Sequence, residues 1–138
     1  MSEKALCARL AKIIGGQVAT NKPACVVQTL RNLNVKILGR RSRSPLTLPF
    51  ALSVESRDSR GRTLNLGETV ILESEINPFV SELRKRGIKV SAIHNHWIFQ
   101  NIQFKYIHWE SIDNPVAFVE KSAAAARAVG ILPKKTKK

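Results

Sequence analysis

Two helix-start signals and two helix-stop signals in the second half of the chain constrain its fold more than any other feature. Each start is an asparagine that can cap a helix, followed by a proline that suits the first helical position: Asn77-Pro78 and Asn114-Pro115. Each stop is a glycine followed by an isoleucine: Gly87-Ile88 and Gly130-Ile131. This spacing predicts helices near residues 78–86 and 115–129.

Runs that are typical of β-strands surround these two helices. In the second half they cover residues 69–73, 88–98 and 102–110. The resulting order, β-α-β-β-α, indicates a ferredoxin-like core in the C-terminal half. The first half adds one amphipathic helix and three further β-like runs: residues 2–14, 24–30, 35–38 and 50–56.

The length of 138 residues fits one domain, which we place over residues 1–132, followed by a disordered basic tail over 133–138. An apolar content of 43% and a charged content of 24% are ordinary for a soluble globular protein. We therefore expect an α+β fold, with a mainly antiparallel sheet and helices on one face.

The formal net charge of +13 is high for a chain of this length. Part of it lies in two clusters, one in a loop and one at the C-terminus: Arg40, Arg41 and Arg43, and Lys134 and Lys135. Such a field attracts polyanions or anionic membrane surfaces. No basic stripe carries interleaved aromatic residues for stacking on bases, so a solvated surface is favoured over a nucleic-acid interface.

The two cysteines, Cys7 and Cys25, lack the spacing of a zinc knuckle. We expect both to be free thiols in a reducing compartment. The N-terminus has no long apolar core like that of a signal peptide, and no run approaches the roughly 20 apolar residues of a membrane helix. These features predict a cytoplasmic protein without a transmembrane segment.

All three histidines fall within one short stretch, His94 and His96 on one β-like run and His108 on the next. Strand faces alternate, so a hairpin loop with an odd residue count places the three imidazoles on one side of the sheet. His108 is then a diagonal neighbour of His94, roughly 7–8 Å away at the backbone. A two-residue loop at Gln100-Asn101 would instead put His108 on the opposite face, and both registers remain open.

Two carboxylates, Glu73 and Glu75, follow an apolar run that we expect to be parallel to the first histidine strand. Glu75 lies at the carboxyl end of that run, where ligand sites are common, and Glu73 is the spare carboxylate. Asn95 lies between His94 and His96, so its side chain should point to the other face and have a structural role.

The leading hypothesis is a small domain that binds a ligand or a divalent metal, with a possible hydrolytic activity. Its metal ligands would be His94, His96 and His108, with Glu75 as fourth ligand or general base. Zinc is the first choice, followed by iron, nickel and manganese. Three protein ligands plus a water molecule would be a catalytic arrangement.

Three other interpretations remain. The histidines can be core residues whose ring nitrogens are satisfied by hydrogen bonds. They can organise a polar pocket for an unknown small ligand. Finally, the domain can be a non-enzymatic module for nucleic acid or another polyanion, through Arg40, Arg41, Arg43, Lys134 and Lys135. No nucleophile elbow and no phosphate-binding loop points to a particular reaction.

The second half of the chain also resembles a known family. The matching pattern is Glu75-Ile-Asn77-Pro78, Arg84, Gly87-Ile88, His94-Asn95-His96 and His108-Trp109. Over about residues 64–128 it resembles the LppY/LpqO-type bacterial family, a domain of unknown function. The resemblance implies that Glu75, His94, Asn95, His96 and His108 belong to the family pattern, and it supplies no activity. Many members of that family look exported or lipid-anchored.

Overall fold

The computed structural model describes residues 2–95, 97–100 and 104–134. Within these residues the chain forms three helices and eight strands. In chain order they are α1 (Glu3–Ile14), β1 (Gln17–Thr20), β2 (Cys25–Leu30), β3 (Val35–Ile37), β4 (Arg40–Ser42), β5 (Pro49–Glu55), β6 (Thr63–Leu72), α2 (Glu73–Lys85), β7 (Lys89–His94), β8 (Phe104–Asp113) and α3 (Pro115–Ala128).

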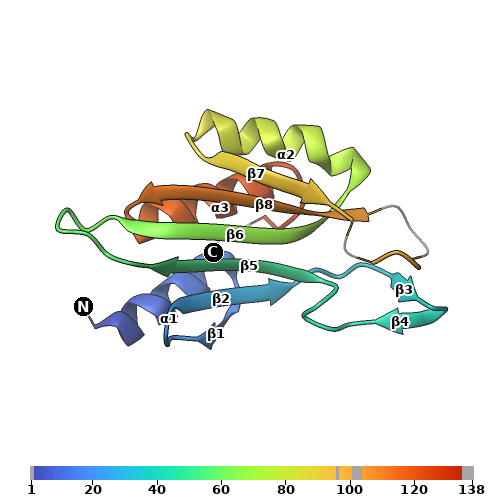
Figure 1. The fold of residues 1–138 in the computed structure, drawn as a ribbon, viewed down its shortest axis with the longest axis horizontal. Coiled ribbons are helices and arrows are strands. Elements are labelled where there is room, and N and C mark those ends of the chain that lie inside the picture. Colours follow the sequence, from blue (N-terminus) through green and yellow to red (C-terminus); the bar gives the residue numbers. More distant parts are fainter. Residues whose placement is uncertain (1, 96, 101–103, 135–138) are drawn as a thin grey trace.

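Six of the strands form one antiparallel sheet in the order β1-β2-β5-β6-β8-β7, and β3 pairs with β4 in a separate hairpin. The three helices pack on one face of the large sheet, where their apolar sides share a core with its strands (Figure 1). The predicted α+β class with a mainly antiparallel sheet is confirmed. In the second half, β8 lies between β6 and β7, and the finer ferredoxin-like assignment stays a prediction.

Only one of the two Asn-Pro signals marks the residue at which a helix begins. Helix α3 begins at Pro115, and the Asn114 side chain accepts hydrogen bonds from the backbone N–H groups of Val116 and Ala117. Helix α2 begins at Glu73, more than one turn before the predicted start, and contains Pro78. The start moves because the carboxylate of Glu75 caps the helix by accepting from the Leu72 backbone N–H at 2.9 Å.

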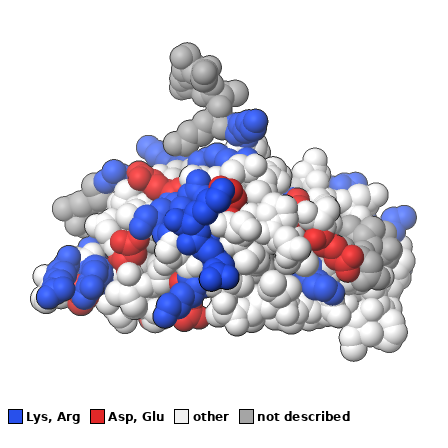
Figure 2. Space-filling view, turned by 90° about the horizontal axis from the view of Figure 1, so that it is seen from above, with Lys and Arg blue, Asp and Glu red and all other residues white. Residues whose placement is uncertain are grey.

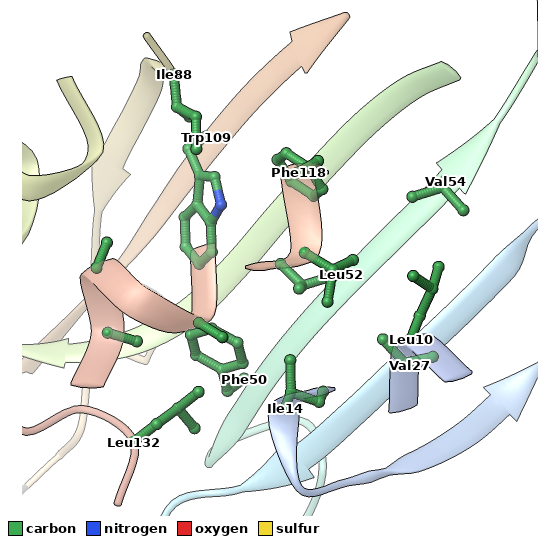
Figure 3. Packing of buried hydrophobic residues seen from close by; sticks show 14 of the residues in the cluster. Leu10, Ile14, Val27, Phe50, Leu52, Val54, Ile88, Trp109, Phe118 and Leu132 are labelled. Carbon is green, nitrogen blue, oxygen red and sulfur yellow. The ribbon is translucent and has the colours of Figure 1, made fainter. Parts of the chain in front are cut away.

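A large aromatic residue organises the core between the sheet and the helices. Trp109 on β8 is almost fully buried, and its indole N–H donates to the Ser122 hydroxyl on α3 at 3.1 Å. Figure 3 shows its ring among side chains from several elements, including Phe50 on β5. The indole lies directly over Gly67 on β6, where an added Cβ would come within 2.1 Å of Cε2. A residue without a side chain is therefore required at this crossing.

A second, smaller core lies on the opposite face of the sheet, because strand side chains alternate between faces. Tyr106 and Phe104 on β8 and Val70 on β6 pack there against residues of the β3–β4 region, including Val35 and Leu48. The β3–β4 hairpin and the segment 97–100 thus cover one end of this face, and the rest of it carries no helix (Figure 1).

The expectation of two free thiols is wrong. Cys7 on α1 and Cys25 at the start of β2 form a disulfide with Cα atoms 5.7 Å apart. Their pairing depends on helix α1 folding back onto β2, a contact that the cysteine spacing does not reveal. The argument for a reducing compartment rested on free thiols and therefore loses its support. No helix in the described ranges is long and apolar enough to span a membrane.

Reducing the disulfide should lower the free energy of unfolding by about 3 kcal/mol, because Cys7 and Cys25 are 18 residues apart and their bridge restricts the unfolded chain. Urea denaturation with and without a reductant measures this difference. The Cys7→Ala/Cys25→Ala variant is the control, and its midpoint should not respond to the reductant. An unchanged midpoint for the reduced wild-type protein would contradict the prediction.

Candidate functional site

The pairing of β7 with β8 settles the histidine register. Ala92 lies opposite His108 and His94 lies opposite Tyr106, so His108 is the diagonal neighbour of His94. The same-face register is confirmed for His94 and His108, and the two-residue-loop alternative is wrong. One detail of the prediction fails: Val90 packs against the helix-side core, whereas His94 faces the other side. A β-bulge between Val90 and Ala92 reverses the alternation within the strand.

The two imidazoles meet on the face of the sheet that carries no helix. The Nε2 atoms of His94 and His108 are 2.8 Å apart, and the ring planes are inclined by only 15°. The Nδ1 atom of His94 lies 2.9 Å from the backbone oxygen of Asn95. A carbonyl oxygen can only accept, so Nδ1 carries a proton, and the Nε2 atom of neutral His94 directs a lone pair at His108. Metal-binding histidines are commonly oriented by this kind of backbone hydrogen bond.

Tyr106 lies next to this histidine pair and stacks against the ring of His94. The His94 ring stacks on the Tyr106 ring, with centroids 6.3 Å apart and planes inclined by 16°. The Tyr106 hydroxyl donates to the backbone oxygen of Thr47 at 2.6 Å, with the oxygen of Leu46 at 3.1 Å. Burial, together with the negative charge of Glu68, raises the pKa of Tyr106 to about 12, so the phenol stays neutral. His94 therefore stacks on an uncharged side chain that hydrogen bonds hold in place.

A carboxylate that the sequence analysis did not single out lies beside the pair. Glu68 on β6 is directly opposite His108 on β8, so the two side chains share the same face. Glu68 and His108 also line one shallow hollow of this face, together with Ala51 and Ser53 of β5. The signal was present in the alternation of residues 64–70, but the expected strand began only at residue 69.

Glu75, the predicted fourth ligand or general base, is held elsewhere. Its two oxygens accept hydrogen bonds from the two terminal nitrogens of Arg31, each at 2.8 Å, and one of them also caps Leu72. The Arg31 guanidinium further donates to the Val70 backbone oxygen at 3.0 Å. The side chains of Arg31 and Glu75 are only 6% and 13% exposed. These contacts give Glu75 a structural role, joining the end of β2 to the start of α2.

The remaining predicted site residues are placed as follows. Glu73 is exposed on the first turn of α2. The Asn95 side-chain oxygen accepts from the Lys105 ammonium at 3.1 Å. His96 lies outside the described residues. Among the residues that are described, no group of three or more His, Cys, Asp and Glu side chains could hold a metal ion, so Glu75 does not join the histidine pair.

The residues of the polyanion alternative do not form one continuous surface. Arg40, Arg41 and Arg43 are exposed in and just after β4, whereas Lys134 lines a hollow beside Arg127 of α3, and Lys135 lies outside the described residues.

Another basic region lies at the end of helix α2, but it is partly neutralised. Figure 2 shows Lys and Arg side chains gathered on the face seen from above, with Asp and Glu side chains among them. Glu82 forms ion pairs with Lys85 and Arg86, and hydrogen bonds from these two residues lower the pKa of its carboxyl group. This region does not extend the arginine cluster of β4 into a basic stripe.

Comparison with known proteins gives one match. A family model described as Domain of Unknown Function (DUF1259) matches residues 8–128. The chain belongs to this family. No curated protein and no solved structure matches the chain. The DUF1259 match spans the histidine pair and Glu68, but it excludes Cys7 and the basic residues after α3. The narrower LppY/LpqO-type relationship stays a prediction.

Proposed function

We propose that this DUF1259 domain binds a divalent metal ion, with zinc as the first choice, through His94 and His108. The observation that supports the proposal is the meeting of the two Nε2 atoms at 2.8 Å, with His94 oriented through its Nδ1 hydrogen bond. Two imidazole nitrogens bound to one tetrahedral zinc, at about 2.0–2.1 Å each, lie roughly 3.3 Å apart. A small separation of the rings is enough to admit the ion between them.

The partial exposure of the pair favours a binding site over two core histidines. His94 is exposed and His108 is half-buried, on a part of the sheet that no helix covers. A core histidine is normally enclosed and satisfied by the surrounding backbone. Here the two rings direct their nitrogens at each other on an accessible face, where an ion from solvent can reach them.

We further propose roles for the two groups next to the pair. His96, two residues after His94 in the sequence and outside the described residues, would supply the third ligand and leave one coordination position for water. Glu68, directly opposite His108, hydrogen-bonds to that water or to the ligated His108 ring. Metal-bound water next to a carboxylate is the arrangement of hydrolytic zinc sites, so the proposal includes hydrolysis as the reaction class to test.

Replacing either histidine of the pair should abolish most metal binding. We expect His108→Ala and His94→Ala each to weaken zinc affinity by about 100-fold or more, since even indirect partners of a metal contribute 10–100-fold. Calorimetric zinc titration and elemental analysis of protein purified without a histidine tag measure this. Binding should also weaken in acidic buffer, because a protonated imidazole cannot ligate.

Asn95→Ala is the matched control, because it lies between the histidines and its side chain contacts Lys105 instead. Its zinc affinity should stay near that of the wild-type protein, while His96→Ala tests the proposed third ligand. If His94→Ala and His108→Ala lower thermal stability and leave the metal content unchanged, the pair is structural and the proposed function is wrong.

We also infer that the domain works in an oxidising compartment. Disulfides persist in such compartments and are rare in the cytosol, and the Cys7–Cys25 bridge joins α1 to the sheet. This inference replaces the cytoplasmic location expected from the sequence. Trapping thiols at the moment of cell lysis, followed by mass spectrometry, should find the two cysteines joined; finding them reduced would reverse it.

A further inference from the structure

The turn between β3 and β4 holds a leucine in a conformation that leucine rarely adopts. Leu38 and Gly39 both have positive φ angles, 51° and 78°, the pattern of a type I′ hairpin turn. The first of these positions normally holds Asn, Asp or Gly. The Leu38 side chain is 78% exposed, so it gains almost nothing from packing. A strained and exposed apolar residue of this kind points to a role outside the fold itself.

A second segment brings two more exposed apolar side chains to the same place. Gln100 bridges to Ile37, and the Leu38 backbone N–H donates to the Phe99 oxygen at 3.4 Å. Ile98 is 87% exposed and Phe99 is 69% exposed. Together with Leu38 they are the three most exposed large hydrophobic residues in the described part of the chain. We call Leu38, Ile98 and Phe99 the apolar tip.

Basic residues flank Leu38 of the apolar tip in the β3–β4 hairpin. Four exposed basic residues lie on or just after the hairpin, and we call them the basic collar: Lys36, Arg40, Arg41 and Arg43. The sequence has no Asp or Glu over residues 4–54 or 83–109, the two stretches that contain the collar and the tip. Within the described residues, the three arginines of the collar form no ion pair. Their charge is therefore not neutralised locally.

Side chains that neighbour the apolar tip in the chain pack into the smaller core, at one end of the molecule. Val35 of β3 and Trp97, which precedes Ile98, both pack into the smaller core with Phe104 and Tyr106. In Figure 1 the β3–β4 hairpin projects beyond the large sheet at one end of the long axis. A flat surface can thus approach the tip without meeting the sheet or the helices.

From these observations we propose that the apolar tip inserts into the surface of an anionic lipid bilayer, with the basic collar at the headgroups. Leucine, isoleucine and phenylalanine side chains suit the boundary between headgroups and acyl chains, and nearby Lys and Arg add attraction to anionic lipid. Nucleic acid is the poorer fit, because two of the three tip side chains are aliphatic and cannot stack on bases. The proposal is independent of metal binding at the histidine pair.

The test is co-sedimentation of the full chain with phosphatidylcholine vesicles, with or without phosphatidylglycerol. We expect binding only to the anionic vesicles. Leu38→Asn should weaken it by about tenfold through lost apolar insertion. This change also suits the turn, so it should not unfold the protein. Ile112→Ser is the matched control, because it removes an exposed apolar residue from β8, far from the hairpin in sequence and in the sheet, and it should bind normally.

The collar is tested separately. Arg40→Glu/Arg41→Glu should weaken binding by more than about tenfold, since each basic residue near the surface contributes roughly fivefold. Arg60→Glu, in the β5–β6 turn, is the control and should have a much smaller effect. The proposal is overturned if the wild-type chain ignores anionic vesicles at low salt. It is also overturned if Leu38→Asn and Ile112→Ser bind equally, or if a single-stranded oligonucleotide binds the collar and vesicles do not.

Discussion

Replacing Glu75 by alanine should lower the free energy of unfolding by about 3 to 5 kcal/mol, because it leaves the buried charge of Arg31 without its partner. The loss includes the hydrogen bond that caps the Leu72 backbone N–H. Urea denaturation of the oxidised protein measures it. The expected effect is on stability, and the zinc affinity of the protein that remains folded should be unchanged.

Glu73→Ala is the matched control, since Glu73 lies on the same helical turn and is exposed. It should cost less than about 1 kcal/mol, the usual size of an interaction with the helix dipole. An apolar replacement of the whole pair, Arg31→Met/Glu75→Leu, should recover much of the stability lost by Glu75→Ala. If Glu75→Ala is as stable as the wild-type protein but loses zinc, the carboxylate belongs to the metal site after all.

Trp109→Ala should destabilise the fold by about 3 to 5 kcal/mol, the range for a large aromatic residue removed from a core. The indole is almost fully buried and contacts Phe50, Phe79 and the backbone at Gly67. Gly67→Ala should cost more than about 2 kcal/mol in the wild-type protein, because the new methyl group has no space beside the ring.

These two effects should not be additive. In the Trp109→Ala protein the methyl group of Gly67→Ala enters the vacated space, so it should cost little or even stabilise. A double-mutant cycle measured by thermal or urea unfolding gives the coupling. If the cost of Gly67→Ala is the same in both backgrounds, the contact between the indole and β6 does not limit the residue at position 67.

The start of a helix could be predicted from the sequence where the capping residue is its immediate neighbour. Asn114 caps α3 through its own side chain, so its start could be predicted from the neighbouring residues. The start of α2 could not, because the capping carboxylate lies inside the helix and is fixed by Arg31, 44 residues away. The Cys7–Cys25 pairing likewise depends on two elements meeting in space.

The same-face placement of His94 and His108 was predicted from alternation on two neighbouring strands. The bulge in β7, which puts Val90 on the helix side, could not be predicted from that alternation. Glu68 was missed because β6 is longer than its β-branched run. Its first half contains Asn65 and Gly67, which are unfavourable in strands. Both are explained by tertiary contacts: Asn65 donates to the Asp113 backbone oxygen, and Gly67 makes room for Trp109.

The bulge in β7 has a consequence for how this strand responds to a change in its length. Val90, before the bulge, packs against the helix-side core. Ala92 and His94, after the bulge, face the open side of the sheet. One extra residue thus divides the strand into a segment that packs into the core and a segment that presents His94 on the open face. Deleting that residue would leave Val90 opposite Trp109 and His94 opposite Tyr106, because the pairing with β8 passes over the extra residue. The pairing with β8, and not the number of residues between Val90 and His94, therefore keeps His94 on the open face.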